Sequence, residues 1–218
     1  MHFNVFPLFP SPVIQVNVEE DTSELLENNN YDAPCSRSED GDIKLSKRIS
    51  NVRVLERFPK TREILLNTFT SVAEEVLGFK KRNYAITTSW VTLCDRGEGS
   101  QLHRHKNSFW SGVYYFQKEY DMGTGGILFD NPNTVLSDFY FGNNDIENYN
   151  QFNITTNTFT PTPSLLLLFP SYLQHQVLNH NNDKPRSSLA FNIVPLGAFG
   201  EHDSSYDYTW VTTNANTI

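Results

Sequence analysis

The sequence is poor in the features that mark several protein classes. It has only two cysteines, Cys35 and Cys94, which lie far apart and form no CxxC pair. We therefore expect two reduced thiols and no disulfide. Long hydrophobic runs are also missing, because the longest, residues 165–169, is far shorter than the about 18–20 residues that span a bilayer. The sequence therefore predicts no membrane-spanning helix.

Positive charge is scarce as well. The 218 residues include 17 Lys and Arg against 25 Asp and Glu, which gives a formal net charge of -8. Without a basic stripe, binding to a nucleic-acid backbone is not expected. The apolar start of the chain has no basic leader and is broken by Pro7, Pro10 and Pro12, unlike a signal peptide. We therefore expect a cytoplasmic protein.

Helical patterns are few. Residues 61–77 carry apolar side chains three to four positions apart and end at Gly78, which predicts an amphipathic helix. Asp21 and Thr22 are placed to cap a short helix through Glu27. The proline-containing, alternating segment 3–18 fits an edge strand or an extended arm.

After Gly78 the period changes to the alternation of β-strands. Strands are expected at residues 83–95, 101–105, 109–117, 125–130, 164–170, 174–179 and 186–194. Many short strands with few helices predict a mainly β sandwich or barrel. We expect one domain over 1–218, with an N-terminal arm and helices (1–82), a β-barrel core (83–195) and an extended polar C-terminal tail (196–218). The Asn- and Thr-rich insert 133–163 suits either a hairpin or a lid.

Two histidines stand one residue apart in the stretch QLHRHKNSF. On a strand, His103 and His105 would point to the same face, and imidazole suits Fe, Zn, Cu or Ni. By itself the pair is also compatible with a polar strand end. His175, on a later strand, adds a third candidate ligand, whereas His180 falls in an Asn-rich turn and is expected to be solvated.

Arg186 opens the apolar strand RSSLAFNIV. A strand-end arginine can extend its head into water. It can also bind a carboxylate through two parallel hydrogen bonds, and Ser188, two residues on, would face the same side. The residues leave both readings open, but three histidines and an Arg-x-Ser on successive strands favour a site.

Four stretches resemble a known family: HxHxNSFxSGVYY, GGILFDNP, LLLFPSYLxHxV and KPRxSLAFN. They are similar to the 2-oxoglutarate/Fe(II)-dependent oxygenases, in a branch common in bacteria and phages, over residues 83–195. The LFPSPV start is similar to the same branch. The resemblance implies a double-stranded β-helix, a cupin-like jelly-roll barrel with one or two supporting helices, that uses Fe(II) and the co-substrate 2-oxoglutarate.

The resemblance also assigns residues. His103 and His175 would be metal ligands, and Arg186 with Ser188 would bind the C5 carboxylate of 2-oxoglutarate. His105 stands where the family usually has an acid, so this chain departs from the 2-His-1-carboxylate pattern. A three-histidine iron site, a site completed by the carboxylate of Asp130, and a site for another metal are the alternatives.

Further residues are candidates for co-substrate, ligand or substrate contacts. Alternation sends one of Tyr114 and Tyr115 inward, where its hydroxyl could bond the co-substrate carboxylate. Asn107, Ser111 and Asn192 are candidates for orienting the imidazoles or a ligand. Trp90 and Trp110 suit the core or a pocket wall.

The expected function is that of a dioxygenase, an oxidoreductase that hydroxylates an unidentified substrate with release of succinate and CO2. The partners would be 2-oxoglutarate and O2, and a homodimer is possible by analogy. The alternative is a cupin-like three-histidine metal protein, either an oxygenase without co-substrate or a non-catalytic ligand-binding barrel.

Overall fold

A computed structural model describes residues 4, 9–28, 44–46, 48–121, 124–133 and 145–207 of the chain. Cys35 and part of the insert 133–163 lie outside these residues. No helix within the described ranges is long and apolar enough to cross a bilayer.

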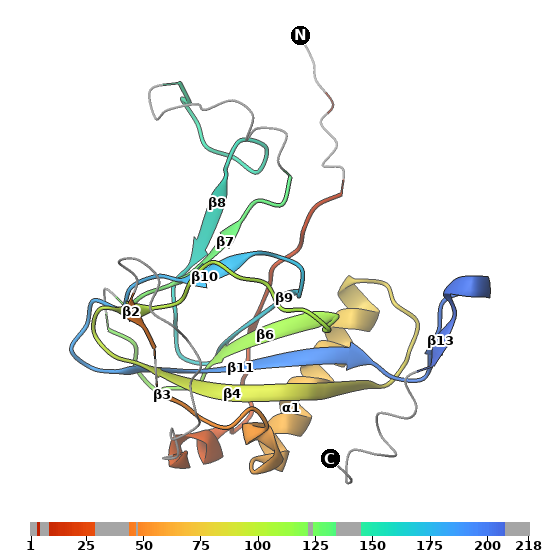
Figure 1. Cartoon of the computed structure of the whole chain (residues 1–218), viewed down its shortest axis with the longest axis horizontal. Helices are drawn as coiled ribbons and strands as arrows, with labels where there is room; N and C mark the ends of the chain where they lie inside the picture. Colours follow the sequence, from red (N-terminus) through yellow and green to blue (C-terminus); the bar gives the residue numbers. More distant parts are fainter. Residues whose placement is uncertain are drawn as a thin grey trace.

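The larger sheet has six strands (Figure 1). In spatial order they are β1 (Ile14–Asn17), β9 (Leu165–Pro170), β6 (Trp110–Tyr115), β11 (Arg186–Pro195), β4 (Tyr84–Cys94) and β3 (Arg48–Ile49). Neighbours are antiparallel throughout. The N-terminal segment contributes β1 as an edge strand, as its alternation and prolines predicted.

The smaller sheet has the antiparallel order β10 (His175–Val177), β7 (Ile127–Asp130) and β8 (Thr156–Phe159). One apolar cluster joins the two sheets and includes Val113, Leu167 and Phe169 from the larger and Ile127 and Phe129 from the smaller. The chain crosses repeatedly between two antiparallel sheets that share a core. The predicted jelly-roll barrel, a double-stranded β-helix, is confirmed.

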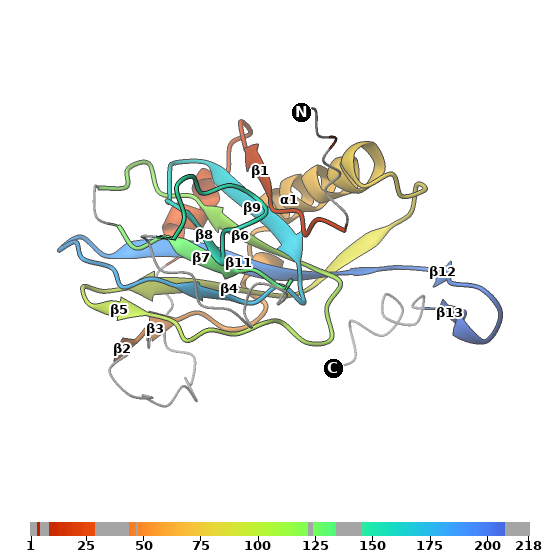
Figure 2. The same ribbon diagram turned by 90° about the horizontal axis from the view of Figure 1, so that it is seen from above.

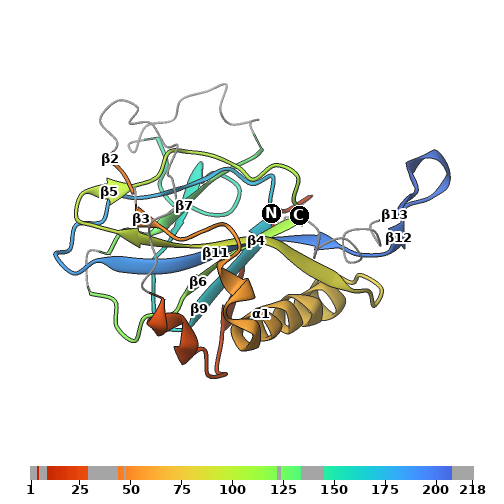
Figure 3. The same cartoon turned by 60° about the horizontal axis from the view of Figure 1, so that its bottom comes forward.

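Helix α1 (Pro59–Ser71) lies across the outer face of the larger sheet and continues as a π-helical turn, Val72–Val76 (Figure 3). Pro59 occupies the first turn, where a missing N–H costs no hydrogen bond. Phe69 packs edge-on against Tyr84 with ring centroids 4.9 Å apart. The helix predicted at 61–77 is confirmed, and the short one is a 3-10 helix, η1 (Ser23–Glu27). A second 3-10 turn, η2 (Val54–Glu56), precedes α1.

Alternation divides the side chains of β11 between the two faces of the larger sheet. Leu189, Phe191 and Ile193 pack in the helix-side core. Ala190 packs in the core between the sheets, so the residues of the same parity, which include Arg186 and Ser188, face the barrel interior. The face of each side chain on β11 therefore decides whether it can reach a site inside the barrel.

Glycine is required at one point of this sheet. A Cβ on Gly112 would meet the ring of Phe191 at 2.3 to 2.8 Å, because that ring lies directly over the β6 backbone. Any larger residue at Gly112 would push Phe191 out of the helix-side core.

Several expectations about local structure are wrong. Residues 101–105 form no regular strand but only an isolated bridge between His103 and His175. His180 is buried, because its backbone pairs with Glu98 and Gly97 and its Nε2 donates to the Lys184 carbonyl. The short strand β5 (Glu98–Gly99) contacts the His180 backbone and runs parallel to β2 (Lys44–Leu45).

The C-terminal segment is not simply extended. Beyond β11 it forms a small hairpin of β12 (Ala198–Phe199) and β13 (Tyr206–Asp207), with a 3-10 turn, η5 (His202–Ser204), between the strands. The hairpin projects beyond the end of the sheets (Figure 2). It therefore contributes nothing to the barrel interior.

Candidate active site

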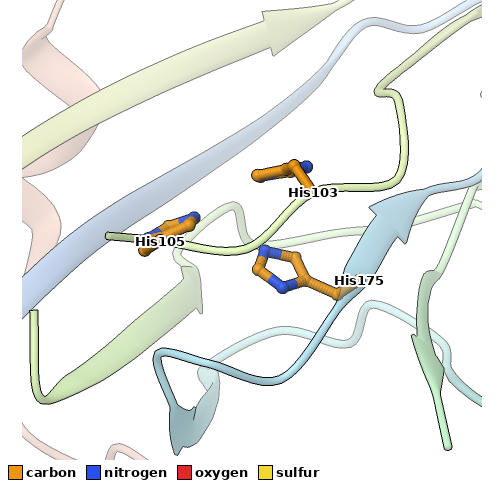
Figure 4. Close-up of side chains that lie close together, drawn as sticks. All are labelled: His103, His105 and His175. Carbon is orange, nitrogen blue, oxygen red and sulfur yellow. The ribbon is translucent and has the colours of Figure 1, made fainter. Parts of the chain in front are cut away.

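Three imidazoles from distant parts of the chain lie close together, with His175 buried and His103 open to solvent (Figure 4). His103 and His105 come from the segment between β5 and β6, and His175 opens β10. Ring centroids are 4.4 Å apart for His103 and His175, 5.1 Å for His105 and His175, and 5.4 Å for His103 and His105. One nitrogen from each ring can be chosen so that all three lie within 4.8 Å of one another.

Backbone hydrogen bonds bring the rings together without a regular strand. His103 and His175 exchange N–H···O bonds of 2.9 and 2.8 Å, and the His105 N–H donates to the Ser171 carbonyl at 3.0 Å. These bonds tie the HxH segment to the turn that leads into β10. The convergence therefore depends on pairing between residues about 70 positions apart in the sequence.

The Nδ1 atoms show which nitrogens are available to a metal. His103 Nδ1 lies 2.8 Å from the Gln101 carbonyl, and His175 Nδ1 lies 2.9 Å from the Leu173 carbonyl. A carbonyl can only accept, so both Nδ1 atoms carry the proton and both Nε2 atoms keep the lone pair that a metal requires. Metal-ligating histidines almost always donate their other N–H in this way. The donor set therefore fits a first-row transition metal.

Burial keeps two of the rings neutral. His175 is 3 % exposed, and burial, followed by the nearby charge of His103, lowers its pKa to about 3. Burial also lowers the pKa of His105. Neutral imidazole is the form that binds metal, so the site is prepared for an ion at neutral pH.

Asp130 does not complete the site. It follows Phe129 on β7, and Phe129 faces the barrel interior with its ring 5.7 Å from that of His175. Alternation sends Asp130 to the opposite face. Within the part of the chain that the structure describes, the cluster contains three histidines and no carboxylate. The described residues therefore bring the three histidines together without Asp130.

Arg186 is a buried cation. Its side chain is 2 % exposed, one terminal N–H donates to the Gly125 carbonyl at 2.9 Å, and the guanidinium also contacts the Cys94 thiol. Its Nε has no partner, and no described carboxylate lies within 4.0 Å of it. A buried charge without a counter-ion lowers the stability of the folded protein by roughly several kcal/mol. The position therefore suits an anionic ligand.

Tyr115 and Ser188 face the interior beside Arg186. Leu189 on β11 pairs with Tyr114 on β6, and Ser188 and Tyr115 are the next residues on these two strands. Tyr115 is 1 % exposed, and burial raises its pKa despite the opposing effect of Arg186. Its hydroxyl therefore stays protonated, and it makes no hydrogen bond to any residue that the structure describes. A carboxylate beside Arg186 would find both hydroxyls on the same face.

Three candidate residues lie elsewhere. Tyr114 points to the helix side, where its hydroxyl lies 2.7 Å from that of Thr22. Trp110 lies on the same face of β6 as Tyr114, and its ring centroid is 5.8 Å from that of Phe69. Asn107 is exposed in a turn with φ of 56°, a conformation that asparagine tolerates. None of the three reaches the barrel interior.

Ser111 and Asn192 do reach His105. The His105 Nδ1 contacts Asn192 Oδ1 and lies 3.1 Å from Ser111 Oγ. Thr88, which the sequence had not singled out, accepts a hydrogen bond from Asn192 Nδ2 at 2.8 Å. Trp90 is half-buried with its ring 5.6 Å from that of His105, and it forms part of the wall of the site. The sequence could have indicated Thr88 as a site residue, because it lies two positions from Trp90 on β4 and so faces the same side of the sheet.

A separate crevice of about 560 Å³ opens beside Gly125 and β10. It is lined by uncharged residues, including Thr158, Gln176 and Asn179, and by none of the three histidines or Arg186. The crevice is therefore distinct from the metal site.

Comparisons with known proteins agree with this chemistry. Residues 88–192 match the family described as "Putative 2OG-Fe(II) oxygenase", a segment that contains all three histidines and Arg186. No curated protein matches the chain.

Solved structures share the fold at low sequence identity. The non-heme alpha ketoglutarate dependent epimerase SnoN from nogalamycin biosynthesis has a TM-score of 0.57 at 11% identity, over 88% of this chain and 82% of its own. A second SnoN structure, in complex with Fe3+, alpha ketoglutarate and nogalamycin RO, has a TM-score of 0.55 at 13% identity, over 91% and 88%.

An oxidoreductase of the 2OG-Fe(II) oxygenase family from Burkholderia pseudomallei has a TM-score of 0.41 at 15% identity. That match covers 60% of this chain, which spans 56% of the other protein's length. The family match falls on the part of the barrel that holds the three imidazoles and the buried guanidinium. Over residues 88–192, slightly less than half of the chain, the sequence is therefore similar to the 2OG-Fe(II) oxygenases, and the fold is shared with solved structures of that type.

Proposed function

We propose that the chain is a dioxygenase that hydroxylates a substrate still to be identified and releases succinate and CO2. His103, His105 and His175 hold the iron. Arg186, with the hydroxyls of Ser188 and Tyr115, binds the C5 carboxylate of 2-oxoglutarate. The observation that carries the proposal is a three-imidazole cluster in the same barrel as a buried arginine that lacks an anion.

When bound, the iron supplies the activation of O2 that couples oxidative decarboxylation of 2-oxoglutarate to insertion of one oxygen atom into a substrate C–H bond. The protein contributes binding and orientation. His103, His105 and His175 would hold the metal through neutral imidazole nitrogens. Arg186 neutralises the distal carboxylate and sets the direction in which 2-oxoglutarate lies.

The lining of the barrel has a further role. Val113, Leu167, Phe129 and Phe169 form the apolar surface between the sheets, next to the ring of His175. An apolar wall excludes water from the reacting groups and strengthens the electrostatic interactions between metal, co-substrate and arginine. The apolar wall therefore helps to direct the oxidation to the substrate and away from side reactions with water.

A three-histidine metal protein without a co-substrate is the second candidate. The absence of a carboxylate ligand among the described residues favours it. Such a protein has no use for a guanidinium buried without a counter-ion, and so Arg186 favours the first candidate. The SnoN fold, solved with Fe3+ and alpha ketoglutarate, adds support because this type of barrel can hold both.

The decisive experiment is anaerobic titration of the apoprotein with Fe(II), followed by 2-oxoglutarate. We expect one equivalent of iron to bind and a visible charge-transfer band to appear only when 2-oxoglutarate is added. Succinate, which lacks the 2-oxo group, is the control and should give no band. Iron binding without a band would favour the co-substrate-independent protein, and no iron binding would refute both.

The remaining expectations about partners and location stay predictions. They comprise a primary substrate other than nucleic acid, a possible homodimer, and a cytoplasmic location. The packing of η1, η2 and α1 against the barrel supports treating residues 1–218 as one functional unit.

A further inference from the structure

The amide of Asn192 is held at both ends inside the barrel. Its Nδ2 donates to Thr88 Oγ1 at 2.8 Å, and its Oδ1 accepts from Ser111 Oγ at 2.8 Å and contacts His105 Nδ1. Asn192 lies on β11 directly beside the point where the register with β4 shifts. The amide oxygen and the Ser111 hydroxyl both contact the Nδ1 atom of His105.

The three histidines differ in how their protons are set. His103 and His175 face backbone carbonyls, which can only accept, so their Nδ1–H tautomers are fixed by the main chain. His105 faces an amide, which can present either a carbonyl oxygen or an NH2 group. Its tautomer therefore depends on which end of Asn192 points toward it.

The two orientations of the amide have opposite consequences. With Oδ1 toward His105, the ring carries its proton on Nδ1 and keeps a lone pair on Nε2. With Nδ2 toward His105, Nδ1 must accept, the proton moves to Nε2, and the ring cannot bind the metal through that atom. Thr88 and Ser111 can adapt to either orientation because a hydroxyl both donates and accepts.

We infer that Asn192 is a positioning residue that selects the metal-binding tautomer of His105 by presenting its amide oxygen to Nδ1. The need arises from the sequence itself. Position 105 carries an imidazole, and an imidazole, unlike a carboxylate, must be set in one tautomer before it can bind. The inference rests on the proposed iron site.

Two contacts carry the oxygen-inward orientation. The amide oxygen faces His105 Nδ1, and Thr88 Oγ1 accepts from Asn192 Nδ2 at 2.8 Å. Ser111 Oγ can donate its one proton either to Asn192 Oδ1 or to Ser171 Oγ, each 2.8 Å away. Ser171 in turn donates to Ser108 at 2.9 Å, and Ser108 donates to the Trp110 carbonyl at 3.0 Å.

The test compares metal affinity in Asn192→Leu and Asn192→Asp. Leucine removes the acceptor, whereas an ionised aspartate can only accept and enforces the Nδ1–H tautomer. We expect Asn192→Leu to weaken Ni(II) binding, measured by calorimetry on the metal-free full chain, by about 10- to 100-fold. Asn192→Asp should bind Ni(II) at least as tightly as the wild type.

Asn131→Leu is the matched control. Asn131 is also half-buried and bonded at both ends, to the Ile154 carbonyl and the Asn133 N–H at 2.9 Å each, but it lies away from the imidazoles. The Asn131→Leu substitution should lower the melting temperature and leave the affinity for Ni(II) unchanged. If Asn192→Leu behaves in the same way, the inference is overturned while the metal site stands.

A second measurement needs no variant. Nitrogen-15 spectra of the histidine rings in the metal-free wild type should show His105 protonated at Nδ1. A His105 ring protonated at Nε2 would overturn the inference. A wild-type protein that binds no Ni(II) would instead overturn the proposed function, so the two failures are distinguishable.

Discussion

Replacing Arg186 with methionine tests the co-substrate site directly. Methionine is flexible, unbranched and uncharged, so it can fill much of the space that the arginine stem occupies. The change removes the guanidinium and its bond to the Gly125 carbonyl, and it leaves the β-strand intact. Because Arg186 is 2 % exposed, solvent cannot replace the lost charge.

The two states of the protein should respond in opposite ways. Removing one partner of a buried ion pair costs about 3–5 kcal/mol, so affinity for a 2-oxoglutarate analogue should fall by roughly 10²- to 10⁴-fold. The ligand-free protein has no such pair among its described residues, and its buried Nε is unsatisfied. In that state Arg186→Met should therefore leave the melting temperature unchanged or raise it.

The assay is binding of N-oxalylglycine, a 2-oxoglutarate analogue, in the presence of Mn(II), measured by calorimetry and by thermal shift. Arg96→Met is the matched control, because Arg96 pairs with Asp183 on the surface with side chains 66% and 85% exposed. Such a pair contributes about 0–1 kcal/mol at most. Analogue affinity within tenfold of the wild type, together with a large loss of stability in the ligand-free state, would show that Arg186 is structural.

The other predictions concern the histidines and the two tyrosines. His175→Ala should abolish stoichiometric Mn(II) binding, whereas Asp130→Asn, on the opposite face of β7, should leave it unchanged; equal effects in calorimetry would contradict the assignment of ligands. Tyr115→Phe should weaken N-oxalylglycine binding by about 10- to 15-fold, the value of one hydrogen bond to a charged group at its lower end. Tyr114→Phe loses hydrogen bonds to Thr22 and Ser164 on the helix side and should lower the free energy of unfolding by about 1 kcal/mol without affecting the ligand. Because burial lowers the pKa of His175 to about 3, the unfolded chain binds more protons than the folded one below the ordinary histidine pKa of about 6.5. The free energy of unfolding of the metal-free protein should therefore be highest above that pH and fall toward pH 3, by up to about 1.4 kcal/mol per unit for this residue. Urea unfolding at several pH values should show a shallower fall in His175→Gln, and an equal slope would contradict the shift.

Much of the fold follows from local patterns. The change from 3.6-residue to 2-residue periodicity at Gly78 separates α1 from the strands, and the expected strands match β6, β7, β9, β10 and β11. The strand β8, inside the insert 133–163, was not predicted. The clearest failure is the segment 101–105, predicted as a strand. Its backbone bonds go to the turn before β10, a partner that no local pattern reveals.

The candidate site was predictable in composition but not in detail. The order of the three histidines and Arg186 along the chain was sufficient to propose metal and carboxylate binding. Alternation also showed that Tyr114 and Tyr115 face opposite sides. It could not show which of the two faces the barrel, because that depends on which face of β6 the helix α1 covers.

By itself, the amino-acid sequence determined the number and order of most strands, the one amphipathic helix, and the residue types available for iron and 2-oxoglutarate. These properties depend on neighbouring residues, through periodicity and turn chemistry. Only the tertiary structure decided that the imidazoles converge, that Asp130 points away, that Arg186 is buried without a counter-ion, and that Asn192 and Thr88 adjoin His105. The physical reason is that these relations are set by the register between strands far apart in the chain, and a shift of one residue would move every side chain to the other face.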